Sequence, residues 1–238
     1  MLFRKFIVSE FGRLIDDAQT ATLKEMTSGE SRDEPTITKG FLDAIKYRIN
    51  GFHARDDVEF RAYVFQPQGY RSDEWVAGAD FLGVLRVNLD EFIVTKGFLA
   101  QAKKESREIG VEIPVRGATK ASFNYTEDFK GLQGQAKKML SQSPSSYVFL
   151  YSPKGFAVVP AISVTSLTVT DTLYAKTARG FFQEFLMCFI GDKRLGAFSN
   201  AEFERLVQEF RAGAGILIEA RRSDSDGYSL TRHRDSPI

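Results

Sequence analysis

Three side chains in the first half of the chain could act together on a phosphate ester, because they are an acid, an amide and an amine. Asp80 follows Gly78-Ala79 at the start of one apolar run, and Gln101 and Lys103 lie two residues apart in the next run. Side chains alternate across a strand, so Gln101 and Lys103 share one face. If the two runs pair as a hairpin, Asp80 should lie beside both of them.

This set of groups suits the hydrolysis of a phosphodiester. Carboxylate and amide oxygens are hard ligands for Mg²⁺, which prefers octahedral oxygen coordination and keeps several of its waters. We expect Asp80 and Gln101 to provide such oxygens and the backbone carbonyl of Ala102 to provide another. The ion would lower the pKa of a bound water and neutralise charge on the phosphate. Lys103 would position that water or stabilise the transition state.

The elements that must hold these residues are two strands and a crossover helix. Residues 78–89 and 92–104 are rich in β-branched and aromatic residues, which predicts two neighbouring strands. Residues 127–142 carry apolar side chains at helical spacing, and residues 146–152 read as the next strand. A helix that connects two strands predicts an α/β layer with a right-handed crossover.

The rest of the chain supplies further helices and strands. Apolar spacing predicts helices at about 8–26, 36–50, 173–191 and 200–213. Strands are expected at 58–65, 156–164 and 215–220, and loops at 66–75 and 105–125. Pro35 suits a first helical turn, so Asp33 or Glu34 is expected to cap the helix that follows.

The tetrapeptide QAKK occurs twice, at 101–104 and 135–138, and the two copies have different surroundings. The first lies in a predicted strand and the second in a predicted helix, so a solenoid repeat is excluded. Gln135, Lys137 and Lys138 are most simply a solvated helix face. In the alternative interpretation, Gln135 points towards the site and the lysines contact phosphates.

Composition limits the classes of function. The chain has 238 residues and a net charge of +1, so binding of nucleic acid would need a local basic face. Cys188 is the single cysteine, which excludes an intramolecular disulfide and argues against a cysteine zinc site. The histidines are only His53 and His233, which gives little support to histidine-based chemistry. The same cysteine content predicts a cytoplasmic protein, and no membrane span is expected, because the most apolar helix, at 181–191, is too short.

The GAD sequence at 78–80, followed about twenty residues later by QAK at 101–103, resembles the PD-(D/E)XK nuclease superfamily. Gln101 replaces the usual second carboxylate, as in the QxK variants similar to Mrr-type restriction enzymes. The order of helix, hairpin, crossover helix and strand extends the resemblance over roughly 30–160. The resemblance implies metal ligation by Asp80 and Gln101 and catalysis by Lys103. It also implies a glutamate from the preceding helix, for which Glu34 is the candidate.

The resemblance further implies a restriction-endonuclease-like α/β fold, with a mixed central sheet flanked by helices in a single domain. We expect this domain at 1–220, with its core at about 30–164, a helical C-terminal part at 165–220 and a flexible polar tail at 221–238.

The expected function is that of a DNA endonuclease dependent on Mg²⁺ or Mn²⁺, with RNA as the other candidate substrate, acting in bacterial restriction or anti-phage defence. Lys104, Gln135 and Lys138 would contact the nucleic acid. A regulatory partner protein and a homodimer are further expectations. The alternative function is that of a decayed nuclease module, which binds nucleic acid or protein within a larger complex.

Overall fold

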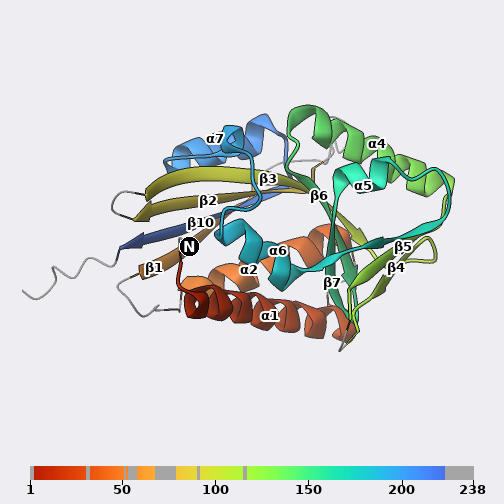
Figure 1. The fold of residues 1–238 in the computed structure, drawn as a ribbon, viewed down its shortest axis with the longest axis horizontal. Coiled ribbons are helices and arrows are strands. Elements are labelled where there is room, and N and C mark those ends of the chain that lie inside the picture. The colour runs from red at the N-terminus through yellow and green to blue at the C-terminus, as the bar shows by residue number, and fades with distance from the viewer. Residues whose placement is uncertain are drawn as a thin grey trace, which may run out of the picture.

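A seven-stranded mixed sheet forms the centre of the molecule, with helices on both of its faces (Figure 1). The computed structural model describes residues 3–30, 33–50, 52, 58–67, 79–89, 92–114 and 117–222. From one edge to the other, the strands are β1 (Val58–Phe65), β10 (Ala214–Arg222), β2 (Phe81–Leu89), β3 (Phe92–Lys104), β6 (Ser146–Ser152), β7 (Gly155–Pro160) and β9 (Lys176–Thr177). The β10–β2 and β3–β6 pairs are parallel, and the other pairs are antiparallel. The expected α/β class, with a mixed sheet between helices, is therefore confirmed.

Strands β2 and β3 form the predicted hairpin. Their register leaves the C-terminal end of β3 without a partner strand on the side that faces β2. Phe81, the first residue of β2, pairs with Ala100, and the pairing continues to Leu89 opposite Phe92. Residues 101–104 of β3 thus extend past the start of β2, although they still pair with β6 on the other side.

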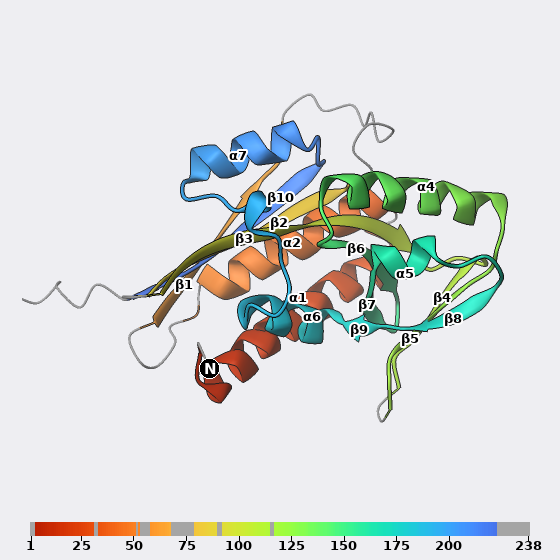
Figure 2. The ribbon, with the colours of Figure 1, turned by 45° about the horizontal axis from the view of Figure 1, so that its top comes forward.

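Three helices cover one face of the sheet: α1 (Lys5–Ser28), α2 (Glu34–Asn50) and α6 (Ala178–Leu186) (Figure 2). Alternate residues of β3, namely Phe98, Ala100 and Ala102, are fully buried on this face. The ring of Phe98 lies 4.9 Å from the rings of both Phe181 and Phe185, centre to centre and edge to face. Such pairs add to the stability that burial of the rings already provides.

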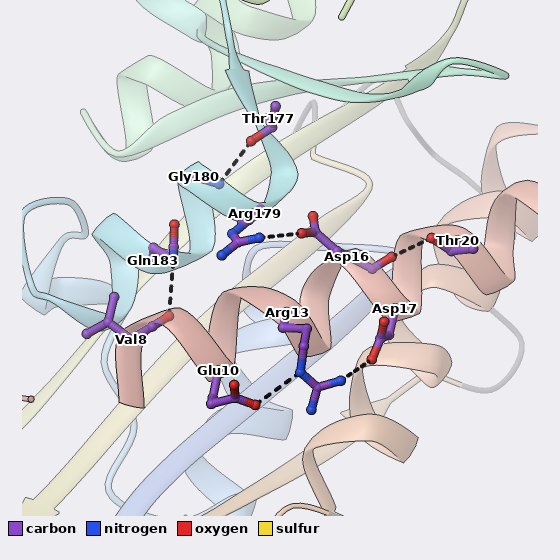
Figure 3. A network of polar contacts seen from close by, with 10 residues as sticks. All are labelled: Val8, Glu10, Arg13, Asp16, Asp17, Thr20, Thr177, Arg179, Gly180 and Gln183. Atoms are coloured by element: carbon purple, nitrogen blue, oxygen red, sulfur yellow. Dashed lines mark hydrogen bonds and ion pairs between the residues drawn. The ribbon is translucent and has the colours of Figure 1, made fainter. Parts of the chain in front are cut away.

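Polar contacts fasten α6 to α1 (Figure 3). An Arg179 Nη1 atom lies 2.8 Å from Asp16 Oδ2, and Gln183 Nε2 donates to the carbonyl of Val8 at 3.0 Å. Gly12 permits this approach, because a Cβ there would lie 2.5 Å from Gln183 Nε2. Short α6 is in this way held in place over the aromatic core.

The opposite face is covered by α4 (Glu127–Gln142) and α7 (Asn200–Glu209). Each begins at a hydroxyl cap, because Thr126 accepts from the N–H of Phe129 and Ser199 accepts from that of Glu202. The residues of β2 and β3 that point away from α2 pack against these helices, and the shared core includes Leu82, Val84, Leu99, Met139 and Leu206. Gln101 and Lys103 alternate with the residues on the α2 side, so they belong to the face that α4 covers.

Three predicted elements are wrong in part. The predicted loop at 105–125 contains β4 (Ile109–Glu112) and β5 (Lys120–Phe123), which form a small sheet with β8 (Asp171–Tyr174). The predicted strand at 156–164 ends at Pro160, where the short helix α5 (Ala161–Thr165) begins. The predicted helix at 173–191 starts only at Ala178, because β8 and β9 precede it, and it ends at Leu186. In each case a short segment follows its tertiary contacts rather than its local composition.

The strand predicted at 215–220 is confirmed as part of β10, and it joins the main sheet although it falls in the stretch expected as the helical C-terminal part. Strand β10 lies inside the main sheet, between β1 and β2, and its residues Ile216, Leu217 and Ile218 are buried. A strand buried on both faces reads as a continuous apolar run, as this one does. Arg221 and Arg222, expected in the tail, belong to this strand, and residues 223–238 lie outside the described residues. A 3₁₀ turn, η1 (Lys193–Leu195), precedes α7.

Candidate active site

The carboxylate of Asp80 lies at the uncovered end of the β2–β3 hairpin. Its Oδ2 accepts hydrogen bonds from Gln101 Nε2 and from the backbone N–H of Ala102, both at 2.6 Å. The N–H of Asp80 itself donates to the carbonyl of Ala100 at 2.7 Å, which continues the ladder by one residue. The predicted proximity of Asp80 to Gln101 is therefore present, whereas the ammonium of Lys103, which was also predicted beside Asp80, contacts Glu34.

Ala102 can serve Asp80 because β2 has not yet begun at this position. The N–H and C=O of one residue point to the same side of its strand, and here no β2 residue pairs with them. The N–H is bound by Asp80, and the carbonyl of Ala102 accepts Gln101 Nε2 at 3.3 Å. The predicted backbone ligand thus faces the same side as the Asp80 carboxylate.

Glu34 comes to the site from the first residue of α2. Its Oε2 lies 3.1 Å from Lys103 Nζ, and its Oε1 accepts from the backbone N–H of Lys104 at 2.9 Å. The side chains of Lys103 and Glu34 keep 25% and 32% of their surface exposed, so the pair is open to a ligand. Glu34, the candidate glutamate of the preceding helix, thus contacts β3 at the same sheet end.

Asp33 caps α2 and so leaves Glu34 available. The Asp33 Oδ1 accepts the N–H of Thr36 at 2.8 Å, and this hydrogen bond lowers the pKa of the Asp33 carboxyl. Of the two alternatives for the cap, Asp33 is the one in the structure. Pro35 follows within the first turn, where a missing N–H has no cost.

A buried tyrosine, which the sequence did not single out, lies behind the two acids. The hydroxyl of Tyr151 is 2.9 Å from Thr38 Oγ1, and both side chains are buried. Burial raises the pKa of Tyr151, the Thr38 hydrogen bond lowers it, and the nearby charges of Asp80 and Glu34 raise it further. Both carboxylates thus contribute to the raised pKa of this phenol. Tyr151 stands in an apolar strand pattern, which carries no signal for such a role.

A cavity of about 770 Å³ opens beside the Glu34–Lys103 pair. The helix α4 forms one of its sides and contributes Gln135 and Lys138, and β3 contributes Lys104. Lys137, between the two α4 residues, is exposed and does not line the cavity. In the second QAKK copy, Gln135 and Lys138 therefore line the cavity, whereas Lys137 is exposed to solvent. The lysines of the lining are matched by an equal number of acids: Lys103, Lys104, Lys130 and Lys138 against Glu34, Glu108, Glu127 and Asp128.

The oxygens at this sheet end fit a hard divalent cation. Within the described ranges there is no cluster of three or more His, Cys, Asp or Glu side chains arranged to hold a metal ion. Two carboxylates, Asp80 and Glu34, contact neighbouring residues of β3 at this sheet end, so further ligands would have to be the amide oxygen of Gln101 and the carbonyl of Ala102. Such an all-oxygen set suits Mg²⁺ or Mn²⁺, which accept water in the remaining positions. The NH₂ group of the Gln101 amide faces Asp80. Rotation about the last side-chain bond of Gln101 would exchange the positions of its amide nitrogen and oxygen, so that the oxygen could face a metal ion.

Comparisons with protein-family models, with curated proteins and with solved structures each found no match. The part of the chain that the structure describes has no helix both long enough and apolar enough to cross a membrane.

Proposed function

We propose that this chain is a nuclease of the restriction-endonuclease-like type, which hydrolyses phosphodiester bonds in DNA with Mg²⁺ or Mn²⁺. The observation that carries the proposal is the contact of Asp80 with Gln101 and Ala102 at the open end of the hairpin, with the Lys103–Glu34 pair on the next residues of β3. The acid, amide and amine come from the positions where the GAD and QAK motifs stand.

Each residue has a defined part in the proposed reaction. Asp80, Glu34, Gln101 and the Ala102 carbonyl would hold the ion, which when bound supplies an activated water and neutralises phosphate charge. Lys103 would direct its ammonium group at the oxygens of the phosphate as negative charge develops there. In the absence of substrate, Glu34 holds that ammonium at 3.1 Å, and the phosphate would share or replace this contact.

The cavity beside Glu34 would take the nucleic acid. Lys104, Gln135 and Lys138 line it and would contact phosphates or sugars, which position a strand without reading its sequence. DNA is the proposed substrate and RNA is the second candidate to be tested. The proposed setting is bacterial restriction or anti-phage defence in the cytoplasm, with a regulatory protein and a homodimer as proposed partners.

Cleavage by the purified full chain tests this function directly. Plasmid DNA and a structured RNA are incubated with Mg²⁺, Mn²⁺ or EDTA, beside the variants Asp80→Asn and Lys103→Ala. Metal-dependent cleavage that both substitutions abolish is the expected result, with Lys137→Ala as the active control on α4. Equal cleavage by all four proteins, or cleavage that persists in EDTA, contradicts the proposal.

One observation favours a second candidate, a catalytically inactive module of the same fold. The Oδ2 atom of Asp80 already receives two N–H donors, and Gln101 stands where an acid would strengthen metal binding. Such a module would bind nucleic acid or protein without cleaving it. Titration with Mn²⁺ separates the two candidates, since the nuclease requires an affinity that Asp80→Asn removes and the inactive module does not.

A further inference from the structure

A second, smaller cavity is lined by Asp80 together with the start of α2 and the turn before β10. Its volume is about 310 Å³, near the lower end of the range for small-molecule sites. The N-terminal turn of α2 contributes Pro35, Thr36, Thr38 and Lys39, and the turn before β10 contributes Arg211 and Gly213. The two cavities adjoin along the chain, because Glu34 lines the larger one and Pro35 the smaller one.

The charge of this second cavity differs from that of the first. Lys39 and Arg211 are its two cations, and Asp80 is the one acid among its described lining residues. Neither cation has an ion pair or side-chain hydrogen bond within the described part of the chain. In the larger cavity every lysine is matched by an acid. Among the described lining residues, the excess positive charge next to the candidate catalytic acid therefore lies in the second cavity.

The turn that carries Arg211 is joined to Asp80 through the backbone. The N–H of Ala214 donates to the carbonyl of Asp80 at 3.1 Å, which fixes the 211–214 turn against the start of β2. Lys39 stands on α2 five residues after Glu34, so it lies a little more than one helical turn from the acid that contacts Lys103. Both side chains are exposed, but the backbone positions that carry them are fixed by helix α2 and by the Ala214–Asp80 hydrogen bond.

We propose that Lys39 and Arg211 bind a backbone phosphate next to the one that is cleaved. The proposal rests on the proposed nuclease function and adds to it. A strand would pass from the α4 cavity, over Glu34 and Asp80, into the second cavity, where its next phosphate meets the two cations. The preferred substrate is then a polynucleotide that continues on both sides of the cut, and a small phosphodiester fills only the centre.

Two substitutions test the subsite without disturbing the fold. Arg211 has a left-handed backbone with φ 48°, a conformation that glycine adopts without strain, so Arg211→Gly removes the charge from a site where glycine is favoured. Lys39→Gln removes the second charge from an exposed helix position. Arg205→Gln is the matched control, because Arg205 is exposed on α7 and lines neither cavity.

Cleavage of two substrates distinguishes the subsite from the active centre. With a long DNA, we expect each of Arg211→Gly and Lys39→Gln to raise KM about tenfold, the usual loss for one charge-assisted phosphate contact. With bis(p-nitrophenyl) phosphate, kcat/KM should stay at the wild-type value. An unchanged KM for DNA, or an equal loss with both substrates, overturns the proposal.

Binding in EDTA gives a test that does not depend on cleavage. Anisotropy of a labelled oligonucleotide, measured against salt concentration, should show a log–log slope smaller by about 0.7–0.9 for each lost charge. Arg205→Gln should keep the wild-type slope, and equal slopes for all variants overturn the subsite. If the wild type binds with the expected slopes but cleaves neither substrate, the proposed nuclease function fails while the subsite stands.

Discussion

The backbone N–H of Ala102 donates to the carboxylate of Asp80 at 2.6 Å, across the place where β2 has not yet started. A residue of β2 would have occupied that N–H if the hairpin were two residue pairs longer, because the ladder ends at Phe81 opposite Ala100. The end of the hairpin therefore supplies two backbone groups on the same side of β3. The N–H of Ala102 is a preorganised donor to one carboxylate oxygen, and the carbonyl of Ala102 is an acceptor. The candidate site depends on where β2 begins.

Asp80→Asn should abolish metal-dependent cleavage while the chain stays folded. The substitution keeps an oxygen that can accept the N–H of Ala102, but it removes the charge that a divalent cation requires. We expect activity to fall at least about a hundredfold, and the free energy of unfolding to change by about 1 kcal/mol. Cleavage assays and urea unfolding measure the two quantities, and full activity would show that Asp80 is no metal ligand.

Lys103→Ala and Lys104→Ala should differ, although the two residues are neighbours. Lys103 contacts Glu34 through its side chain, whereas Lys104 contacts it through its backbone N–H, which alanine retains. We expect loss of cleavage for Lys103→Ala and at most a severalfold increase in KM for Lys104→Ala. Because the Lys103–Glu34 pair is partly exposed, its loss should cost about 0–1 kcal/mol of stability. Equal kcat for both variants would contradict this assignment.

Lys138→Ala should weaken DNA binding more than Lys137→Ala. The two residues are adjacent on α4, but Lys138 lines the cavity and Lys137 is exposed outside it. Loss of a phosphate contact lowers the slope of log affinity against log salt by about 0.7–0.9, and loss of a remote charge changes it little. Titration of labelled DNA at several salt concentrations gives both slopes. Similar slopes for the two variants would place the nucleic acid elsewhere.

Tyr151→Phe should destabilise the protein and flatten its response to alkaline pH. The substitution leaves the buried hydroxyl of Thr38 without its tyrosine partner, at a cost of about 1–3 kcal/mol. Burial raises the pKa of Tyr151 above its unfolded value, so the folded state binds the phenolic proton more tightly. This contribution to stability is complete below the unfolded pKa of about 10 and is lost as pH rises above it.

Unfolding by urea between pH 7 and pH 11 measures this effect. The wild type should lose more free energy of unfolding above about pH 10 than Tyr151→Phe does, and the difference between the curves belongs to Tyr151. The other titrating groups are common to both proteins and cancel. Parallel curves would show that the phenol does not titrate differently in the folded and unfolded states.

The amino-acid sequence by itself determined the hairpin and the part of the site that lies within it. The strands at 58–65, 92–104 and 146–152 and the helix at 127–142 have the predicted bounds. Asp80 and Gln101 are 21 residues apart, and a short connection with alternating side chains leaves few possible registers. Their contact could therefore be predicted without knowledge of the rest of the fold.

Only the tertiary structure decided which distant segments complete the site. Glu34 reaches Lys103 over 69 residues, Thr38 meets Tyr151 over 113, and β10 enters between β1 and β2. Local patterns carry no information on such contacts, because they arise when whole faces of helices and strands are buried together. Strands β4 and β5 form within the predicted loop at 105–125 for the same reason. Their alternating apolar residues gain stability only by packing against α4 and α5.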